Sequence, residues 1–238
     1  MIRLICSRQF LSTYFHLLLL ISFAFLACGA LLSGRMVFTL SLNYLFLPFN
    51  LVLAALPIAF SILFSHAKKP SRRVCFAALW LLFFPNAPYI ITDFIHLTRI
   101  GGAHGAPLWF DVLLVASYAG AGLIFGYVSL LQMQNSIAAD FPRASWGIAV
   151  LSCFLAGFGI YLGRFLRWHS VHIFLDPVPL LLDVLDRFLN PLNHPRTWGV
   201  TLGFGSLILF GYLGLVVTAR LIRTPQHAAF GGSQEPIP

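Results

Sequence analysis

The fold is decided by a polar stretch with two prolines inside an otherwise apolar segment, Phe84-Pro85-Asn86-Ala87-Pro88-Tyr89-Ile90-Ile91-Thr92-Asp93-Phe94-Ile95-His96. On a helix of about 100° per residue, four of its polar side chains share one face: Asn86, Tyr89, Asp93 and His96. Each proline lacks a backbone donor and crowds the preceding turn, so the helix should kink and free the carbonyls of Leu81 and Phe84. Because lipid offers no hydrogen bonds, these carbonyls need partners within the protein.

The composition around this stretch indicates an integral membrane protein. Of the 238 residues, 59% are hydrophobic and 9% are charged, whereas soluble domains carry about 25% charged residues. Six apolar segments are long enough to span a bilayer, at residues 14–33, 43–65, 74–97, 109–133, 144–167 and 198–219. We therefore expect an all-α fold, with a single six-span membrane domain over residues 1–223 and a disordered tail over residues 224–238.

The basic residues predict the orientation of the chain. The net charge is +8, and the charges lie between the apolar segments, where they fit anionic lipid headgroups better than nucleic acid. With the N-terminus inside, nine Lys and Arg residues fall on the cytoplasmic side and six outside, and the cluster at residues 68–73 decides the balance. Both termini are therefore predicted to be cytoplasmic. The first segment resembles a signal peptide, but its length favours a retained helix.

Two further patterns concern packing. Residues 176–191 begin with Asp176 before a proline and end before another proline, as an amphipathic helix too short to span does. We expect it to lie on the outer membrane surface. Glycines four apart occur in spans four and five, at Gly122 and Gly126 and at Gly159 and Gly163. Such pairs let helix backbones approach closely, and we interpret them as packing within one subunit.

Polar side chains gather where spans three, four and five meet the outer side. The candidate ligand-binding residues are Asn86, Tyr89, Asp93, His96, Trp109, Asp111, Arg164, Arg167, Trp168 and His169. Charged groups at membrane depth usually pair, so we expect Asp93 and Asp111 to face Arg164 and Arg167. A rim of histidines should lie above them, formed by His96, His104, His169 and His172.

Three functions fit this arrangement. The arginines could bind an anionic small molecule or a lipid headgroup. Alternatively, Asp93 and His96 could be the acid and base of a membrane enzyme with a lipid-linked substrate. The third alternative is a scaffold or accessory subunit in which the charges only clasp helices. The oligomeric state stays open.

Cofactor and metal sites are not predicted. The sequence contains no Gly-x-Ser-x-Gly elbow, P-loop, dinucleotide fingerprint or His-Glu-x-x-His motif, so we expect no cofactor. Asp93 and His96 offer two types of metal ligand on one helical face, but Arg164 and Arg167 would repel a cation. The expected partner is the lipid bilayer.

Three blocks of sequence resemble the domain-of-unknown-function 1361 family of bacterial multi-pass membrane proteins. They are residues 80–97, Pro107-Leu108-Trp109-Phe110-Asp111, and Gly159-Ile160-Tyr161-Leu162-Gly163-Arg164-Phe165-Leu166-Arg167-Trp168. In the family pattern, the third block continues Arg-Trp-Asn-Ser-Trp-Asp, whereas this chain has His169 and His172 in place of the asparagine and the acid. The resemblance implies the membrane fold, the site and the bacterial inner membrane, but no reaction.

Overall fold

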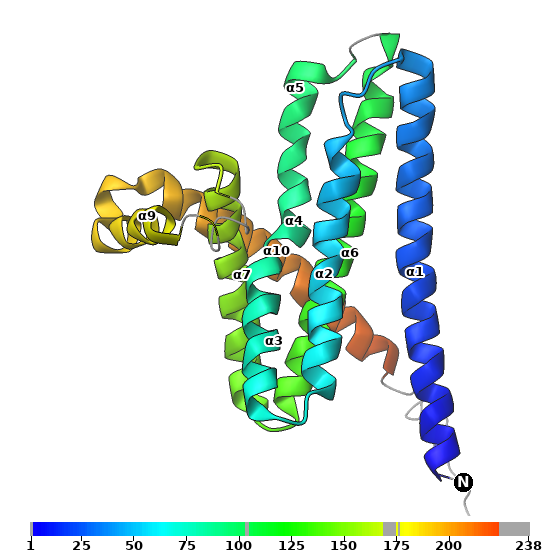
Figure 1. The fold of residues 1–238 in the computed structure, drawn as a ribbon, viewed down its shortest axis with the longest axis vertical. Coiled ribbons are helices and arrows are strands. Elements are labelled where there is room, and N and C mark those ends of the chain that lie inside the picture. The colour runs from blue at the N-terminus through cyan, green and yellow to red at the C-terminus, as the bar shows by residue number, and fades with distance from the viewer. Residues whose placement is uncertain (1, 103–104, 169–174, 176, 224–238) are drawn as a thin grey trace, which may run out of the picture.

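The computed structural model describes residues 2–102, 105–168, 175 and 177–223 (Figure 1). The predicted disordered tail, the cap Asp176 and the rim residues His104, His169 and His172 lie outside the described residues. Within the described residues, six helical segments are long and apolar enough to cross a membrane, which confirms the six predicted spans and the all-α, multi-pass fold.

Five spans are single helices and the third is interrupted. The single helices are α1 (Ile2–Thr39), α2 (Phe46–His66), α6 (Leu108–Ala138), α7 (Pro142–Phe165) and α10 (Pro195–Arg223). The third span consists of α3 (Pro70–Phe83), α4 (Asn86–Tyr89), the 3₁₀ helix η1 (Ile90–His96) and α5 (Leu97–Ile100). Figure 1 shows α10 crossing the bundle obliquely, and it packs mainly on α7.

The interruption lies at the two prolines, as predicted. Helix α3 ends at Phe83, and the carbonyl of Phe84 accepts a hydrogen bond from the Ala87 N–H at 3.2 Å. Asn86 Nδ2 donates to the Phe83 carbonyl at 2.9 Å. This side-chain hydrogen bond satisfies a carbonyl at the point where the backbone hydrogen bonds of the helix are interrupted. The chain then continues as seven residues of 3₁₀ helix, an unusually long run that accompanies functional or strained positions.

Both glycine pairs make room for this interruption. A Cβ atom added at Gly122 of α6 would lie 2.6 Å from the Ala87 carbonyl oxygen, and one at Gly159 of α7 would lie 2.7 Å from ring carbons of Pro85. The short helix α4 is thus held between the backbones of α6 and α7. This confirms that the glycines pack helices within one subunit.

Among the residues whose burial the structure describes, two apolar clusters are shared by the helices. One cluster joins α1, α2, α4 and α6, and the other joins α2, α3, α6, α7 and α10. Large apolar side chains also cover the outside of the spans: Phe23 is 71% exposed and Phe210 is 77% exposed. Contact with lipid requires an apolar exterior, and every span has one. The protein therefore contacts the lipid bilayer.

The short helix α9 (Pro177–Leu189) confirms the predicted helix between spans five and six, and η3 (Pro191–Asn193) follows it. Figure 1 shows α9 at the side of the bundle, beyond the end of α7. Its Leu180 and Arg187 are buried, whereas Leu181, Leu182 and Leu189 are exposed. Trp168 Nε1 donates to Asp183 Oδ2 at 2.7 Å and attaches the helix to the end of span five. Its position on the membrane surface stays a prediction.

Candidate functional site

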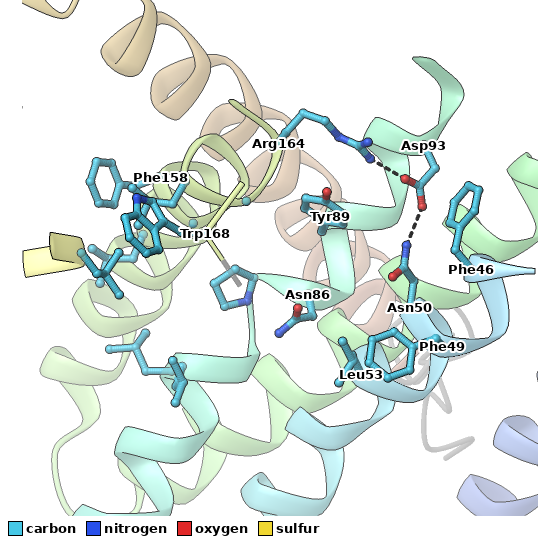
Figure 2. Close-up of a pocket in the computed structure, with 18 of the residues that line it drawn as sticks. Phe46, Phe49, Asn50, Leu53, Asn86, Tyr89, Asp93, Phe158, Arg164 and Trp168 are labelled. Carbon is cyan, nitrogen blue, oxygen red and sulfur yellow. Dashed lines mark hydrogen bonds and ion pairs between the residues drawn. The ribbon is translucent and has the colours of Figure 1, made fainter. Parts of the chain in front are cut away.

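A cavity of about 420 Å³ lies between α2, the interrupted third span, α7 and α9 (Figure 2). This volume is typical of small-molecule sites. Six of the ten predicted site residues line it: Asn86, Tyr89, Asp93, His96, Arg164 and Trp168. The polar stripe of the third span therefore faces a cavity, although part of that span is 3₁₀ rather than α-helical.

An ion pair between Asp93 and Arg164 forms the polar end of the cavity. Arg164 Nη2 donates to Asp93 Oδ1, and Asn50 Nδ2 donates to Asp93 Oδ2 at 2.9 Å (Figure 2). Arg164 also donates to Thr92 Oγ1, from Nε at 2.9 Å and from Nη2 at 2.6 Å. Both carboxylate oxygens of Asp93 are thus occupied, and the residue is 1% exposed. The predicted pairing of Asp93 with Arg164 is confirmed.

Arg164 itself remains accessible from the cavity. Its side chain is 16% exposed, and its guanidinium carbon lies 4.7 Å from the centroid of the Tyr89 ring. Nη1 lies 3.3 Å from His96 Nε2, which accepts this bond when the imidazole is neutral with its proton on Nδ1. A guanidinium has five N–H donors, and its contacts with the described residues use four of them. One donor is left for another partner.

Asp111 lies elsewhere, and the expectation that it pairs with Arg164 or Arg167 is wrong. Arg35 Nε lies 2.5 Å from Asp111 Oδ1, and Arg35 Nη2 lies 3.3 Å from Oδ2. The Gly102 N–H donates to Oδ2 at 3.0 Å. Arg35 reaches Asp111 because it lies one turn before the end of α1, which packs beside the start of α6. The arginine and the carboxylate are 1% and 0% exposed.

The surroundings of this second pair are closed. Arg35 lies over the ring of Tyr44, 4.5 Å from its centroid, and Nη1 donates to Thr39 Oγ1 at 3.5 Å. Burial, together with the negative charge of Asp111, raises the pKa of Tyr44 to about 12, so this phenol stays neutral at physiological pH. Neither Arg35 nor Asp111 lines the cavity.

The other predicted site residues do not join the cavity. Arg167 is exposed and has a left-handed backbone, with φ of 61°. This turn lets the Trp168 N–H donate to the Leu162 carbonyl at 3.0 Å, and Trp168 lines the cavity while Arg167 does not. Trp109 is 66% exposed and also lies apart from it. His169 is not among the described residues.

Sequence reasoning missed Asn50, Thr92 and Arg35. Asn50 and Thr92 were visible as polar residues inside apolar spans, but uncharged polar residues are common in membrane helices and give a weak signal. Arg35 was a stronger signal, because a charge near membrane depth needs a partner. Within residues 2–102, 105–168, 175 and 177–223, no three His, Cys, Asp or Glu side chains form a group that could hold a metal ion.

Comparison with known proteins gives one match. No curated protein and no solved structure matches the chain. A family model described as "Protein of unknown function (DUF1361)" matches residues 49–210, which is more than half of the chain. The match includes Asn50, Asp93 and Arg164 and leaves out all of α1, with Arg35. The chain therefore belongs to the DUF1361 family, as the resemblance of its three sequence blocks indicated.

Proposed function

We propose that this protein binds a molecule with an anionic group, a phosphate or a carboxylate, through Arg164. The observation that carries the proposal is the remaining N–H donor of a partly exposed guanidinium at the polar end of a largely apolar cavity. Charge-assisted hydrogen bonds from arginine to such anions are about twice as strong as neutral ones. Thr92 and Asp93 hold the guanidinium in place, and Asn50 in turn holds Asp93, so little entropy is lost when an anion binds.

We further propose that the protein lies in a bacterial inner membrane, with both termini and the tail in the cytoplasm and the cavity toward the outer leaflet. The six basic residues on the cavity side include three that pair with aspartates within the protein, namely Arg35 and Arg187, which are buried, and Arg164, which is 16% exposed. Lys68, Lys69 and Arg72 at the opposite end are more exposed. The resulting excess of exposed positive charge favours that end as cytoplasmic.

The contacts of Asp93 favour binding over acid–base catalysis. A general base must reach the proton that it removes, but both oxygens of Asp93 already accept hydrogen bonds and the side chain is 2% exposed. His96 Nε2 is directed to Arg164 and lies 3.8 Å from Asp93 Oδ1. Asp93 is thus better suited to position Arg164 than to contact a substrate.

Two arginines three residues apart provide a matched test. We expect dodecyl phosphate to raise the thermal midpoint of the wild type purified in dodecyl maltoside, a neutral detergent with the same chain. Arg167→Gln should respond like the wild type, because Arg167 lies outside the cavity, whereas Arg164→Gln should lose at least about tenfold in apparent affinity. An equal response of all three proteins would refute the proposal.

The scaffold alternative makes a different prediction. If Asp93 and Arg164 only clasp helices, exchanging them in the double variant Asp93→Arg with Arg164→Asp should restore the folding lost in each single variant. We expect no such rescue, because Asn50, Thr92 and Tyr89 are arranged around a carboxylate at position 93 and a guanidinium at position 164. Full rescue, together with an unchanged lipid content in mass spectrometry, would favour the clasp.

A further inference from the structure

We infer that the ligand is a lipid whose hydrocarbon chain lies in the apolar part of the same cavity, rather than a free small anion. The inference rests on the proposed function, since it takes Arg164 as the headgroup site. The inference adds where the hydrocarbon chain lies, how the lipid is oriented in the membrane and how the lipid enters the cavity.

The cavity changes from polar to apolar in the same direction on two of the three spans that line it. On the third span, the lining residues run from His96 and Asp93 back to Leu82 and Leu81. On α7, they run from Arg164 back to Phe158 and Leu155. On α2, by contrast, apolar side chains line the cavity on both sides of Asn50, namely Phe46, Phe49 and Leu53. Asp93 and Arg164 bond one another near the ends of spans three and five, so the apolar residues that precede them on these spans point toward the middle of the membrane.

The apolar part of the cavity is long enough to hold a hydrocarbon chain. Leu155 and Arg164 lie on the uninterrupted helix α7, nine residues apart, which corresponds to about 14 Å along the helix. A small inorganic anion at Arg164 would leave this part of the cavity without an occupant. A lipid in the outer leaflet already has its headgroup at the surface and its chain toward the middle, so it would match the gradient without turning over.

The rim of the cavity indicates how such a chain enters. Phe49 of α2 and Leu81 of α3 line the cavity and are also 65% and 38% exposed. They belong to both the cavity wall and the apolar exterior of the spans, so the cavity is continuous with the lipid-facing surface. Trp168, which lies beside Phe158 in Figure 2, and Leu180 of α9 complete the lining. Entry sideways from the bilayer therefore requires no aqueous channel.

The test compares butyl phosphate with dodecyl phosphate, which share a headgroup and differ in chain length. Leu155→Trp fills the apolar part, and Leu151→Trp is its control, because Leu151 lies one turn away on α7 and is 57% exposed outside the cavity. We expect Leu155→Trp to bind dodecyl phosphate about tenfold more weakly than the wild type, which corresponds to roughly two excluded methylene groups. Its response to butyl phosphate should be unchanged, and Leu151→Trp should behave like the wild type.

Unchanged dodecyl phosphate binding by Leu155→Trp would overturn the inference, as would an equal loss of both probes. The variant Arg164→Gln separates this outcome from failure of the proposed function. If the proposed function is wrong, Arg164→Gln should respond to butyl phosphate and dodecyl phosphate as the wild type does. Photoaffinity labelling of the wild type does not depend on whether Leu155→Trp folds. Dodecyl phosphate with a terminal diazirine should label the segments around Leu53, Leu81 and Leu155, whereas labelling spread evenly over lipid-facing positions such as Leu151 would count against a bound chain.

Discussion

Two arginine–aspartate pairs lie at the same end of the helical bundle, and their surroundings differ. Arg35 and Asp111 are 1% and 0% exposed, and Arg35 lies over the ring of Tyr44. Arg164 is 16% exposed, and with its partner Asp93 it borders a cavity of about 420 Å³. Both pairs join segments more than 70 residues apart in the sequence. Burial of charge in a membrane protein is therefore a poor indicator of a binding site by itself.

The distinguishing features are exposure of the guanidinium and an adjacent cavity. Asp111 receives bonds from Arg35 and from the Gly102 backbone, and neither residue of the pair lines the cavity, so the pair is suited to holding α1 against α6. Arg164 is 16% exposed and faces a cavity that continues among leucine and phenylalanine side chains. The first pair is suited to stability and the second to recognition.

The largest expected effect is on the closed pair. Arg35→Ala leaves the Asp111 carboxylate buried without its cation, which should reduce the free energy of unfolding by about 3–5 kcal/mol. The double variant Arg35→Met with Asp111→Leu should recover most of this loss, because two apolar side chains need no counter-charge. Thermal unfolding in detergent measures both effects. A single variant as stable as the wild type would show that the pair contributes nothing to holding α1.

A smaller loss of stability is expected at Gly122, where α6 packs closely against α4. Gly122→Ala places a methyl group 2.6 Å from the Ala87 carbonyl, so α4 must shift and the stability should fall by about 1–3 kcal/mol. Gly120→Ala is the control on the same helix, because no atom lies within 4 Å of its Cβ position. The comparison uses the thermal midpoints of the two variants. If they are equal, the close approach of α6 to the interruption has no energetic importance.

Thr92→Val tests how firmly the open pair is positioned. It removes the hydroxyl that accepts from Nε and Nη2 of Arg164, so we expect a loss of about 1 kcal/mol in stability and a parallel weakening of phosphate binding. Thr98→Val is the matched control, because its exposed hydroxyl bonds the Ile95 carbonyl outside the cavity. Titration of both variants with dodecyl phosphate should separate them. Identical binding curves would mean that Thr92 does not orient the guanidinium.

The smallest effect concerns an exposed pair, Asp186 with His194, which provides a reference for the two buried ones. Hydrogen bonds from Asn190 and His194 lower the pKa of Asp186 below its ordinary value of 3.8. A lowered folded-state pKa contributes stability above that ordinary value, and the contribution is lost as the pH falls through the lowered one. The thermal midpoint of Asp186→Asn should thus be slightly lower than that of the wild type at pH 6, and the two midpoints should be equal at strongly acidic pH. A constant difference across this range would contradict the assignment.

The sequence was sufficient to predict the spans and one wall of the site. Apolar segment length determined the six helices, and the two prolines predicted the interruption where α3 ends. Asn86, Tyr89, Asp93 and His96 were expected on one face and all line the cavity. These predictions succeed because they depend on local chemistry, namely helix period, proline geometry and the cost of charge in lipid.

The partners of the charged residues could not be predicted in the same way. Asp111 was expected to face Arg164 or Arg167, yet it bonds Arg35, whose helix is 76 residues away in the sequence. The helix period places a side chain on a face, but it does not specify which helix packs there. Arg167 illustrates a second difficulty, since its left-handed φ of 61° turns it away from the face that it would share with Arg164 on a continuous helix.

The long sequence separation of Asp93 and Arg164 has a consequence for biosynthesis. The two residues are 71 positions apart, so at about 5–20 residues per second the carboxylate emerges from the ribosome roughly 4–14 s before its cation. An unpaired aspartate costs about 2.5–3.5 kcal/mol at the centre of an inserting helix, and this value is an upper bound for Asp93, which lies near the end of span three. Asn50 is synthesised earlier and bonds Asp93 Oδ2 in the finished protein, so this hydrogen-bond donor is already present when span three enters the membrane.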